Sequence, residues 1–92
     1  MLANKKVITE FLKKNFNLSA SSVSSKEDKL FSYSTIIAQW FGDTLLVNTT
    51  KYSVTTSKAQ SNLIYLIGKN INWYTVDNIS MGTSDLKYLY HG

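Results

Sequence analysis

The stretch LFSYSTIIAQWFGDTLLVNTT, residues 30–50, decides the fold of this chain of 92 residues. Its two halves, Leu30–Phe41 and Thr44–Thr50, are rich in β-branched and aromatic residues, which favour β-strands. Gly42 and Asp43 separate the halves, and a glycine in the first central position is typical of a type II′ turn. The stretch therefore predicts an antiparallel β-hairpin centred on these two residues.

Downstream of the hairpin, the sequence predicts further strands. Tyr52–Thr55 has the composition of a short third strand, and Ile71–Val76 has that of a last one. Ser84 is placed to cap a short terminal helix over Asp85–Tyr90. We therefore expect an antiparallel sheet of three to four strands.

A helix is predicted between these strands, over Lys58–Ile67. Ser57 and Gln60 have the spacing of a capping box at its start, and Gly68 suits the left-handed residue that ends a helix. We expect the apolar stripe of this helix to pack on the sheet, and the stripe consists of Ala59, Leu63, Leu66 and Ile67.

The N-terminus is predicted to form an amphipathic helix over Asn4–Phe16. A basic helix of this kind can lie on a membrane or on a partner. Because so small a core can hardly spare five large apolar residues, we expect the helix to cover the domain's own sheet. Its apolar stripe consists of Val7, Ile8, Phe11, Leu12 and Phe16, and its other side carries Lys5, Lys6, Lys13 and Lys14.

Ser19–Lys29, SASSVSSKEDK, is a stretch of low complexity that ends in a run of charges. Such a composition is typical of an exposed, flexible linker. The whole chain is therefore predicted to be one small α+β domain over residues 1–92. It would comprise an N-terminal helix within residues 1–18, a serine-rich linker over residues 19–29 and an α+β core over residues 30–92.

The sequence lacks the residues that several chemistries need. There is no cysteine, which excludes a thiolate nucleophile and a Cys-based zinc site, and the one histidine, His91, argues against a histidine triad. The six acidic residues are scattered over predicted turns and surface rather than paired for acid–base work. We expect no catalytic residue, no metal site and no cofactor, and hence a protein that is not an enzyme.

The sequence also indicates a compartment. No run approaches the roughly 20 apolar residues of a membrane span. The N-terminal stretch MLANKKVITEFLKKNF has lysines where an export signal needs apolar residues. We therefore expect a cytoplasmic protein without a membrane partner.

The net charge is positive, and lysine supplies all of the positive side chains. Ten lysines against six acidic residues give a formal net charge of +4, and the chain has no arginine. Lysine suits contacts to phosphate, whereas arginine supplies the bidentate recognition of guanine. The chain either binds a polyanion with little sequence discrimination or uses lysine for solubility alone.

Tyrosines interleaved with lysines are the first candidates for a binding surface. Aromatic residues make up 13% of the chain, more than so small a core needs. Such rings stack on bases or anchor a protein partner; alternatively, they cover a thin sheet while their hydroxyls stay in water. The candidate binding residues are Tyr33, Tyr52, Tyr65 and Lys51, together with Lys5, Lys6, Lys13 and Lys14 of the N-terminal helix.

Thr56, Ser57 and Lys58 are the second candidate. Hydroxyls and backbone N–H groups at a helix N-terminus form an anion site, for which Lys58 would supply the countercharge. The alternative is plain capping, in which one hydroxyl accepts from a backbone amide and nothing binds. The sequence leaves both interpretations open.

The segment Leu30–Leu63 resembles a family of small uncharacterised proteins found in bacteriophages and other mobile elements. The resemblance rests on the run LFSYSTIIAQW and on the block YSVTTSK, Tyr52–Lys58. Ala59 stands where the family pattern has histidine. The resemblance implies a phage or mobile-element origin and a cytoplasmic setting, and it implies no established biochemical activity.

Composition and resemblance together predict a non-catalytic accessory protein that binds and inhibits a host macromolecule. The most concrete form is inhibition of a defence nuclease, as by an anti-CRISPR protein, with a host protein or ribonucleoprotein as the partner. One alternative is a small basic regulator that binds nucleic acid directly. Another is a minor component of virion assembly.

Overall fold

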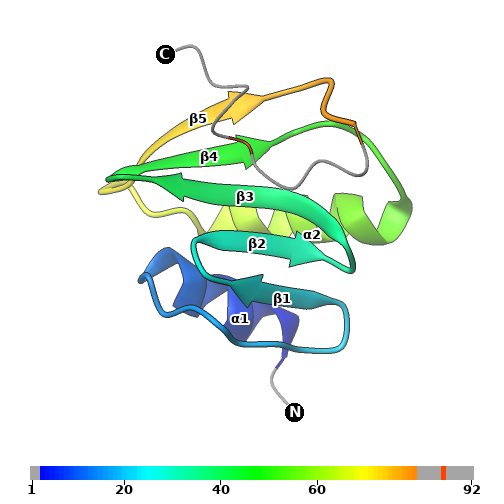
Figure 1. Ribbon diagram of the computed structural model, residues 1–92, viewed down its shortest axis with the longest axis horizontal. Helices are drawn as coiled ribbons and strands as arrows, with labels where there is room; N and C mark the ends of the chain where they lie inside the picture. The colour runs from blue at the N-terminus through cyan, green and yellow to red at the C-terminus, as the bar shows by residue number, and fades with distance from the viewer. Residues whose placement is uncertain (1–2, 81–85, 87–92) are drawn as a thin grey trace.

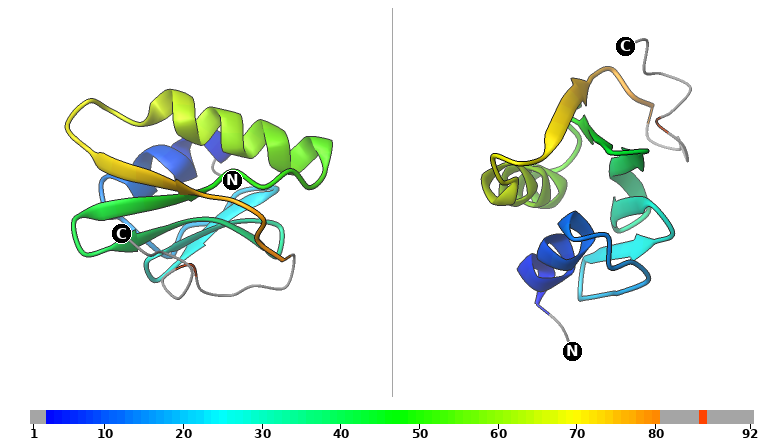
Figure 2. Two further views of the ribbon diagram at one scale, coloured as in Figure 1. Left: turned by 90° about the horizontal axis from the view of Figure 1, so that it is seen from above. Right: turned by 90° about the vertical axis from the view of Figure 1, so that its left-hand side faces the viewer.

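Two helices and five strands make up the part of the chain that the computed structural model describes, residues 3–80 and Leu86. The strands form one sheet in the order β1-β2-β3-β4-β5, and both helices lie on the same face of it (Figures 1 and 2). The α+β class is confirmed, with a larger sheet than the three to four strands expected. In chain order the elements are α1 (Asn4–Leu12), β1 (Val23–Lys26), β2 (Lys29–Ser32), β3 (Thr35–Phe41), β4 (Thr44–Asn48), α2 (Val54–Leu66) and β5 (Asn72–Val76).

The predicted hairpin is confirmed as β3 and β4. The two strands pair antiparallel with Phe41 opposite Thr44, which leaves Gly42 and Asp43 as the turn. Gly42 has a φ of 61°, the positive value that a type II′ turn needs at its first central residue. The hairpin therefore follows from a backbone conformation that glycine adopts easily.

The last strand runs in a direction that the sequence did not predict. β5 pairs parallel to β4, with Leu45 opposite Trp73, whereas β1 to β4 pair antiparallel. Parallel neighbours need a long crossover connection, and α2 supplies it. β5 is an edge strand of the sheet, and its residues 72–75 are exposed.

The larger hydrophobic core lies between the sheet and the two helices. Val7 and Phe11 of α1 and Leu63 of α2 are completely buried in it. Trp40 of β3 joins this core, and its indole Nε1 donates to the Phe11 carbonyl at 3.0 Å. The expectation that the N-terminal helix covers the domain's own sheet is therefore confirmed. A smaller core on the other face consists of Ile36, Leu46, Val76, Ile79 and Leu86.

The serine-rich stretch is not a linker, and this prediction was wrong. Residues 23–26 form β1, whose Val23 and Ser25 are buried. The small Ser25 side chain fits there because its hydroxyl accepts from the Leu18 amide at 3.1 Å. Asn4 donates to the Ser22 hydroxyl at 2.8 Å, so α1 is bonded to this stretch rather than hinged by it.

Two other predicted boundaries were also wrong. α1 ends at Leu12 rather than at Phe16, because the chain leaves the helix at Lys14, which has a φ of 64°. The expected strand Leu30–Phe41 breaks into β2 and β3 at a turn formed by Tyr33 and Ser34. In both cases a residue other than glycine adopts the left-handed conformation, which residue type does not signal.

The second helix begins four residues earlier than predicted. Ser53 caps it, since its hydroxyl accepts from the Thr56 amide at 3.2 Å, so Ser57 is not the cap and residues 52–55 are not a strand. The helix ends at Leu66, and Ile67 continues in extended conformation, with Gly68 outside the left-handed region. The predicted helix over residues 85–90, with its cap at Ser84, lies outside the described residues apart from Leu86.

Candidate binding surface on helix α2

The block Thr56–Lys58 is not arranged as an anion site. Thr56 is buried, and its hydroxyl lies 3.3 Å from that of Ser32 and 3.2 Å from that of Ser53. Lys58 is exposed and Ser57 is half-buried, on the outer side of the helix. Because one hydroxyl turns inward, the three side chains do not converge on a common ligand.

The outward side of α2 carries a stripe of four exposed side chains, which we call the outer stripe of α2: Val54, Lys58, Ser61 and Tyr65. Side chains three or four residues apart lie above one another on a helix. Val54 is 76% exposed and Tyr65 is 86% exposed. Two large side chains with apolar surface thus stand in water, in line with a cation.

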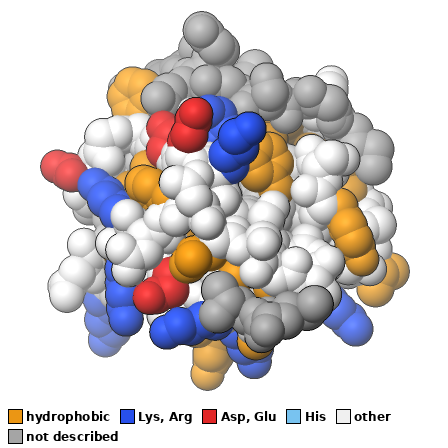
Figure 3. Space-filling model, turned by 60° about the horizontal axis from the view of Figure 1, so that its bottom comes forward, with side chains coloured by type: hydrophobic (Ala, Val, Ile, Leu, Met, Phe, Trp, Pro, Cys, Tyr) orange, Lys and Arg blue, Asp and Glu red, His pale blue; other side chains and the backbone are white. Residues whose placement is uncertain are grey.

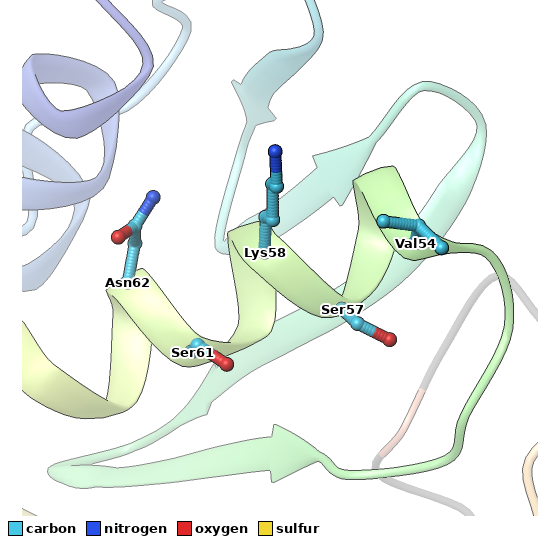
Figure 4. A pocket seen from close by; sticks show the side chains of 5 residues that line it. All are labelled: Val54, Ser57, Lys58, Ser61 and Asn62. Atoms are coloured by element: carbon cyan, nitrogen blue, oxygen red, sulfur yellow. The ribbon is translucent and has the colours of Figure 1, made fainter.

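A shallow, open hollow of about 400 Å³ lies along the N-terminal half of this stripe. Figure 4 shows Lys58 and Asn62 extending to one side of the helix and Ser57 and Ser61 to the other. Within the described ranges no carboxylate pairs with Lys58. Because all five lining residues come from one helix, the hollow suits contact with another surface better than enclosure of a small molecule. The lining residues are Val54, Ser57, Lys58, Ser61 and Asn62.

Tyr52 has a structural role, because its hydroxyl is hydrogen-bonded within the domain. Its hydroxyl donates to the Ile79 carbonyl at 2.6 Å and accepts from Asn48 Nδ2 at 3.0 Å. The Asn48 carboxamide oxygen accepts from the Thr50 amide at 3.0 Å, and Gln60 of α2 donates to the carbonyls of Asn48 and Thr50. These bonds hold the connection between β4 and α2, so the Tyr52 hydroxyl serves this connection.

The other predicted tyrosines are exposed but lie apart. Tyr65 belongs to the outer stripe of α2, whereas Tyr33 is 65% exposed at the turn between β2 and β3. Lys51 is exposed in the connection that precedes α2. The structure therefore brings Lys58 and Tyr65 together on one helix face, with Ser57 beside them.

Three of the predicted lysines are exposed, Lys5 and Lys6 on α1 and Lys13 directly after it. Lys6 and Lys13 lie 3.8 Å and 3.9 Å from the carboxylate oxygens of Glu10, which offsets part of their charge. Lys5 makes no ion pair among the described residues. Exposed pairs of this kind contribute little to stability.

Lys14 has a structural position instead. Its ammonium lies 3.2 Å from the Asp43 carboxylate and 4.7 Å from the centre of the Trp40 ring. It therefore ties the end of α1 to the β3–β4 turn through a charge pair and a cation–π contact.

The positive charge on one face of the molecule is not gathered in a single patch. Figure 3 shows acidic side chains among the lysines of one face, with much uncharged polar surface between them. A continuous basic track, the usual footprint of a nucleic-acid-binding protein, is therefore not evident on that face. In the described part of the chain, the lysines without an ion pair are Lys5, Lys26, Lys51, Lys58 and Lys69.

Sequence reasoning missed several exposed residues. Val54 was not singled out because the helix was placed too late, and the spacing of Ser53 and Thr56 was the signal that would have corrected it. Ser61, which is exposed, and Asn62, which is half-buried, lie inside the predicted helix but outside its apolar stripe, and they were not singled out either. Trp73 and Tyr74 of β5 are also exposed. Residue type alone does not show this, because tryptophan and tyrosine occur at buried as well as at exposed positions.

Neither a metal centre nor a membrane span is found in the described ranges. There, no three His, Cys, Asp or Glu side chains gather in a way that could hold a metal ion. None of the helices in this part of the chain is long and apolar enough to cross a bilayer.

Comparisons with known proteins give a family and no activity. No curated protein and no solved structure matches the chain significantly. One family model matches residues 2–75, a range that contains both helices and all but the last residue of β5. Since this match spans most of the chain, the protein belongs to the family of unknown function DUF8033.

Proposed function

We propose that this protein is a non-catalytic binding protein that occupies a site on another macromolecule through the outer stripe of α2. The observation that carries this proposal is the exposure of Tyr65, 86%, in line with Lys58 and Val54 on one helix face. Tyrosine is favoured in interfaces because a rigid ring adds large contact area and its hydroxyl can form a hydrogen bond.

The inner side of α2 supports this role because it holds the helix firmly. Leu63 is completely buried, and the Gln60 carboxamide donates to two carbonyls of the preceding connection, at 2.7 Å and 2.8 Å. A side chain on a helix that is already ordered loses less freedom on binding than one on a mobile loop. The outer stripe of α2 is thus presented at low entropic cost.

The form of this function that we favour is inhibition of a host macromolecule by a protein of phage or mobile-element origin, with a defence nuclease as the most concrete target. The resemblance carried by the block Tyr52–Lys58 supports that origin. The net charge of +4 argues against mimicry of a DNA duplex, because such a mimic would be acidic. Contacts through Tyr65 and Lys58 to a protein surface, or to a guide RNA held by it, agree with this charge.

Direct binding of nucleic acid is the second candidate function. Lys58 and Tyr65 combine a cation with an exposed ring, the pairing with which proteins bind single strands. The dispersal of the other lysines over separate segments favours a protein partner instead. The two functions differ in salt dependence, because each phosphate contact that binds releases counterions.

Capture from an extract of bacterial cells, with and without nuclease treatment, tests the proposal. The double variant Lys58→Glu, Tyr65→Ser changes only exposed side chains, and Lys26→Glu is the matched control because Lys26 is an exposed lysine without an ion pair in the described part of the chain. We expect the wild type to retain a protein partner after nuclease treatment. The double variant should retain at least about tenfold less of the partner protein than the wild type does, and the control should retain as much as the wild type.

Three results would contradict the proposal. Equal capture by the double variant and the wild type would show that α2 is not the binding surface. Loss of every partner on nuclease treatment, with a shift of mixed oligonucleotides that weakens steeply with salt, would favour nucleic-acid binding. Self-association of the purified protein without other partners would favour the virion component.

A further inference from the structure

Three hairpin turns of the sheet share one backbone geometry. Each has two central residues, and the first of them has a positive φ: 55° at Glu27, 55° at Tyr33 and 61° at Gly42. Glycine adopts this left-handed conformation without cost, whereas a residue with a side chain meets steric conflict there. Tyrosine, with its large ring, is therefore an unexpected residue at such a position.

The other non-glycine residues with positive φ in the described ranges use their side chains within the fold or tolerate the conformation. Lys14 pairs with Asp43 at 3.2 Å, the Asn17 carboxamide accepts from the Glu27 amide at 3.1 Å, and Glu27 lies 3.8 Å from Lys29. The remaining one is an asparagine, a type that enters this region readily. The strain at these positions is thus accompanied by a local interaction or is small.

Tyr33 has no such compensation. Its backbone amide donates to the Ser22 carbonyl at 2.8 Å, a bond that glycine would make equally well. Its side chain is 65% exposed, and neither its hydroxyl nor its ring has a hydrogen bond or ring contact with the described residues. A strained, exposed residue that contributes so little to the fold indicates a constraint from function.

The turn that carries Tyr33 adjoins the start of α2. The hydroxyl of Ser32, next to Tyr33, lies 3.3 Å from that of Thr56 in the first turn of α2. Figure 1 shows the turn between β2 and β3 at the same end of the molecule as the start of α2, on the right of the view. The exposed Tyr33 and Val54 therefore lie at the same end of the molecule, Tyr33 in a turn of the sheet and Val54 at the start of the outer stripe of α2.

The composition of the hairpin that carries Tyr33 favours one class of partner. Within β2, β3 and the turn between them, residues 29–41, the only charged residue is Lys29, at the end of β2 away from the turn, and Tyr33 stands between serines. A tyrosine that stacks on bases works beside cations that hold the phosphates. We propose that Tyr33 is the anchor with which this protein enters a concave, largely apolar pocket on a partner protein. This inference rests on the proposed function, namely that the chain binds another macromolecule.

Variants at two equivalent turn positions separate the role of the ring from that of the backbone. Tyr33→Gly removes the ring and relieves the strain, Tyr33→Phe keeps the ring, and Glu27→Gly is the matched control in the neighbouring hairpin. The melting temperature is measured for each, together with the amount of protein retained from a nuclease-treated bacterial extract. A photo-crosslinking phenylalanine analogue at position 33, with the same analogue at position 27 as control, reports direct contact.

We expect Tyr33→Gly to melt at the wild-type temperature or up to about 4 °C above it. Relief of the backbone strain stabilises the variant, and this gain offsets both the loss of the side chain and the greater conformational entropy of glycine in the unfolded chain. The same variant should retain at least about tenfold less of the partner than the wild type does, as expected for the loss of an anchor. Tyr33→Phe and Glu27→Gly should retain it within about threefold of the wild type. The analogue should crosslink to the retained protein from position 33 and not from position 27.

Several results would overturn the inference. A Tyr33→Gly variant that melts well below Glu27→Gly would show that the ring serves the fold. Full capture by a stable Tyr33→Gly variant would refute the anchor while leaving the proposed function standing, provided that the Lys58→Glu, Tyr65→Ser variant still loses the partner. If the wild type retains no protein from the treated extract, the anchor and the proposed function both fail.

Discussion

Replacing Tyr52 with phenylalanine removes one oxygen atom from the hydrogen-bond network that holds the connection between β4 and α2. The lost hydroxyl donates to the Ile79 carbonyl at 2.6 Å and accepts from Asn48 Nδ2 at 3.0 Å. The ring itself stays in place, so no cavity forms. Tyr52→Phe therefore measures the two hydrogen bonds almost alone.

The expected loss of stability follows from the hydrogen bonds that Asn48 keeps and the one that it loses. Asn48 is completely buried and retains its bond to the Ile36 carbonyl at 2.9 Å, but its second amide hydrogen loses its acceptor. A net hydrogen bond contributes about 1 kcal/mol, and a buried polar group without a partner costs about 1–3 kcal/mol. We expect the free energy of unfolding to fall by about 2–3 kcal/mol, which lowers the melting temperature of a domain of this size by about 10 °C or more.

Urea and thermal unfolding followed by circular dichroism measure this loss, and Tyr65→Phe is the matched control because Tyr65 is 86% exposed. The control should unfold as the wild type does. A Tyr52→Phe variant within about 0.5 kcal/mol of the wild type would refute the structural role of the hydroxyl, since this is the range of ordinary surface substitutions. Reduced partner capture by a variant of unchanged stability would make Tyr52 a binding residue after all.

Substitutions in α2 and at two glycines test the remaining structural assignments by urea unfolding. Leu63→Ala should cost about 3–4 kcal/mol because Leu63 is completely buried, and Leu66→Ala about 1–2 kcal/mol because Leu66 only flanks the core; equal losses would contradict this orientation of the helix. Gly42→Ala should cost about 1 kcal/mol from its φ of 61°, since no atom lies within 4 Å of an added Cβ. Gly68→Ala, which is equally open but outside the left-handed region, should be neutral or slightly stabilising, and a cost at Gly68 as large as at Gly42 would show that strain is not the cause.

The local pattern of residues was enough to predict the β3–β4 hairpin and the burial of α1. Gly42 marks the turn because a positive φ depends on the residue type at one position. Val7, Ile8 and Phe11 recur at helical spacing, and such a stripe has to be buried whatever covers it. Both features depend on neighbours in sequence, so no knowledge of distant contacts was needed.

Features that depend on distant contacts could not be predicted in the same way. The composition around Ser25 indicates a linker, yet its hydroxyl bonds to the Leu18 amide once β1 joins the sheet. The β-branched residues after Tyr52 favour a strand, yet a helix forms because Ser53 caps it and Gln60 bonds to the connection before it. In each case the partner becomes available only when the tertiary structure has formed.

The candidate binding site shows the same division. The sequence by itself determined which side chains are able to bind, since lysine, tyrosine and serine are recognisable as types, and Tyr52 and Tyr65 were equal candidates on that basis. Only the tertiary structure decided between them: the hydroxyl of Tyr52 meets Asn48 and Ile79, whereas Tyr65 points away from the sheet on the outer side of α2. The physical reason is that residue type sets the chemistry of a side chain, while its exposure depends on packing between segments that are far apart in the chain.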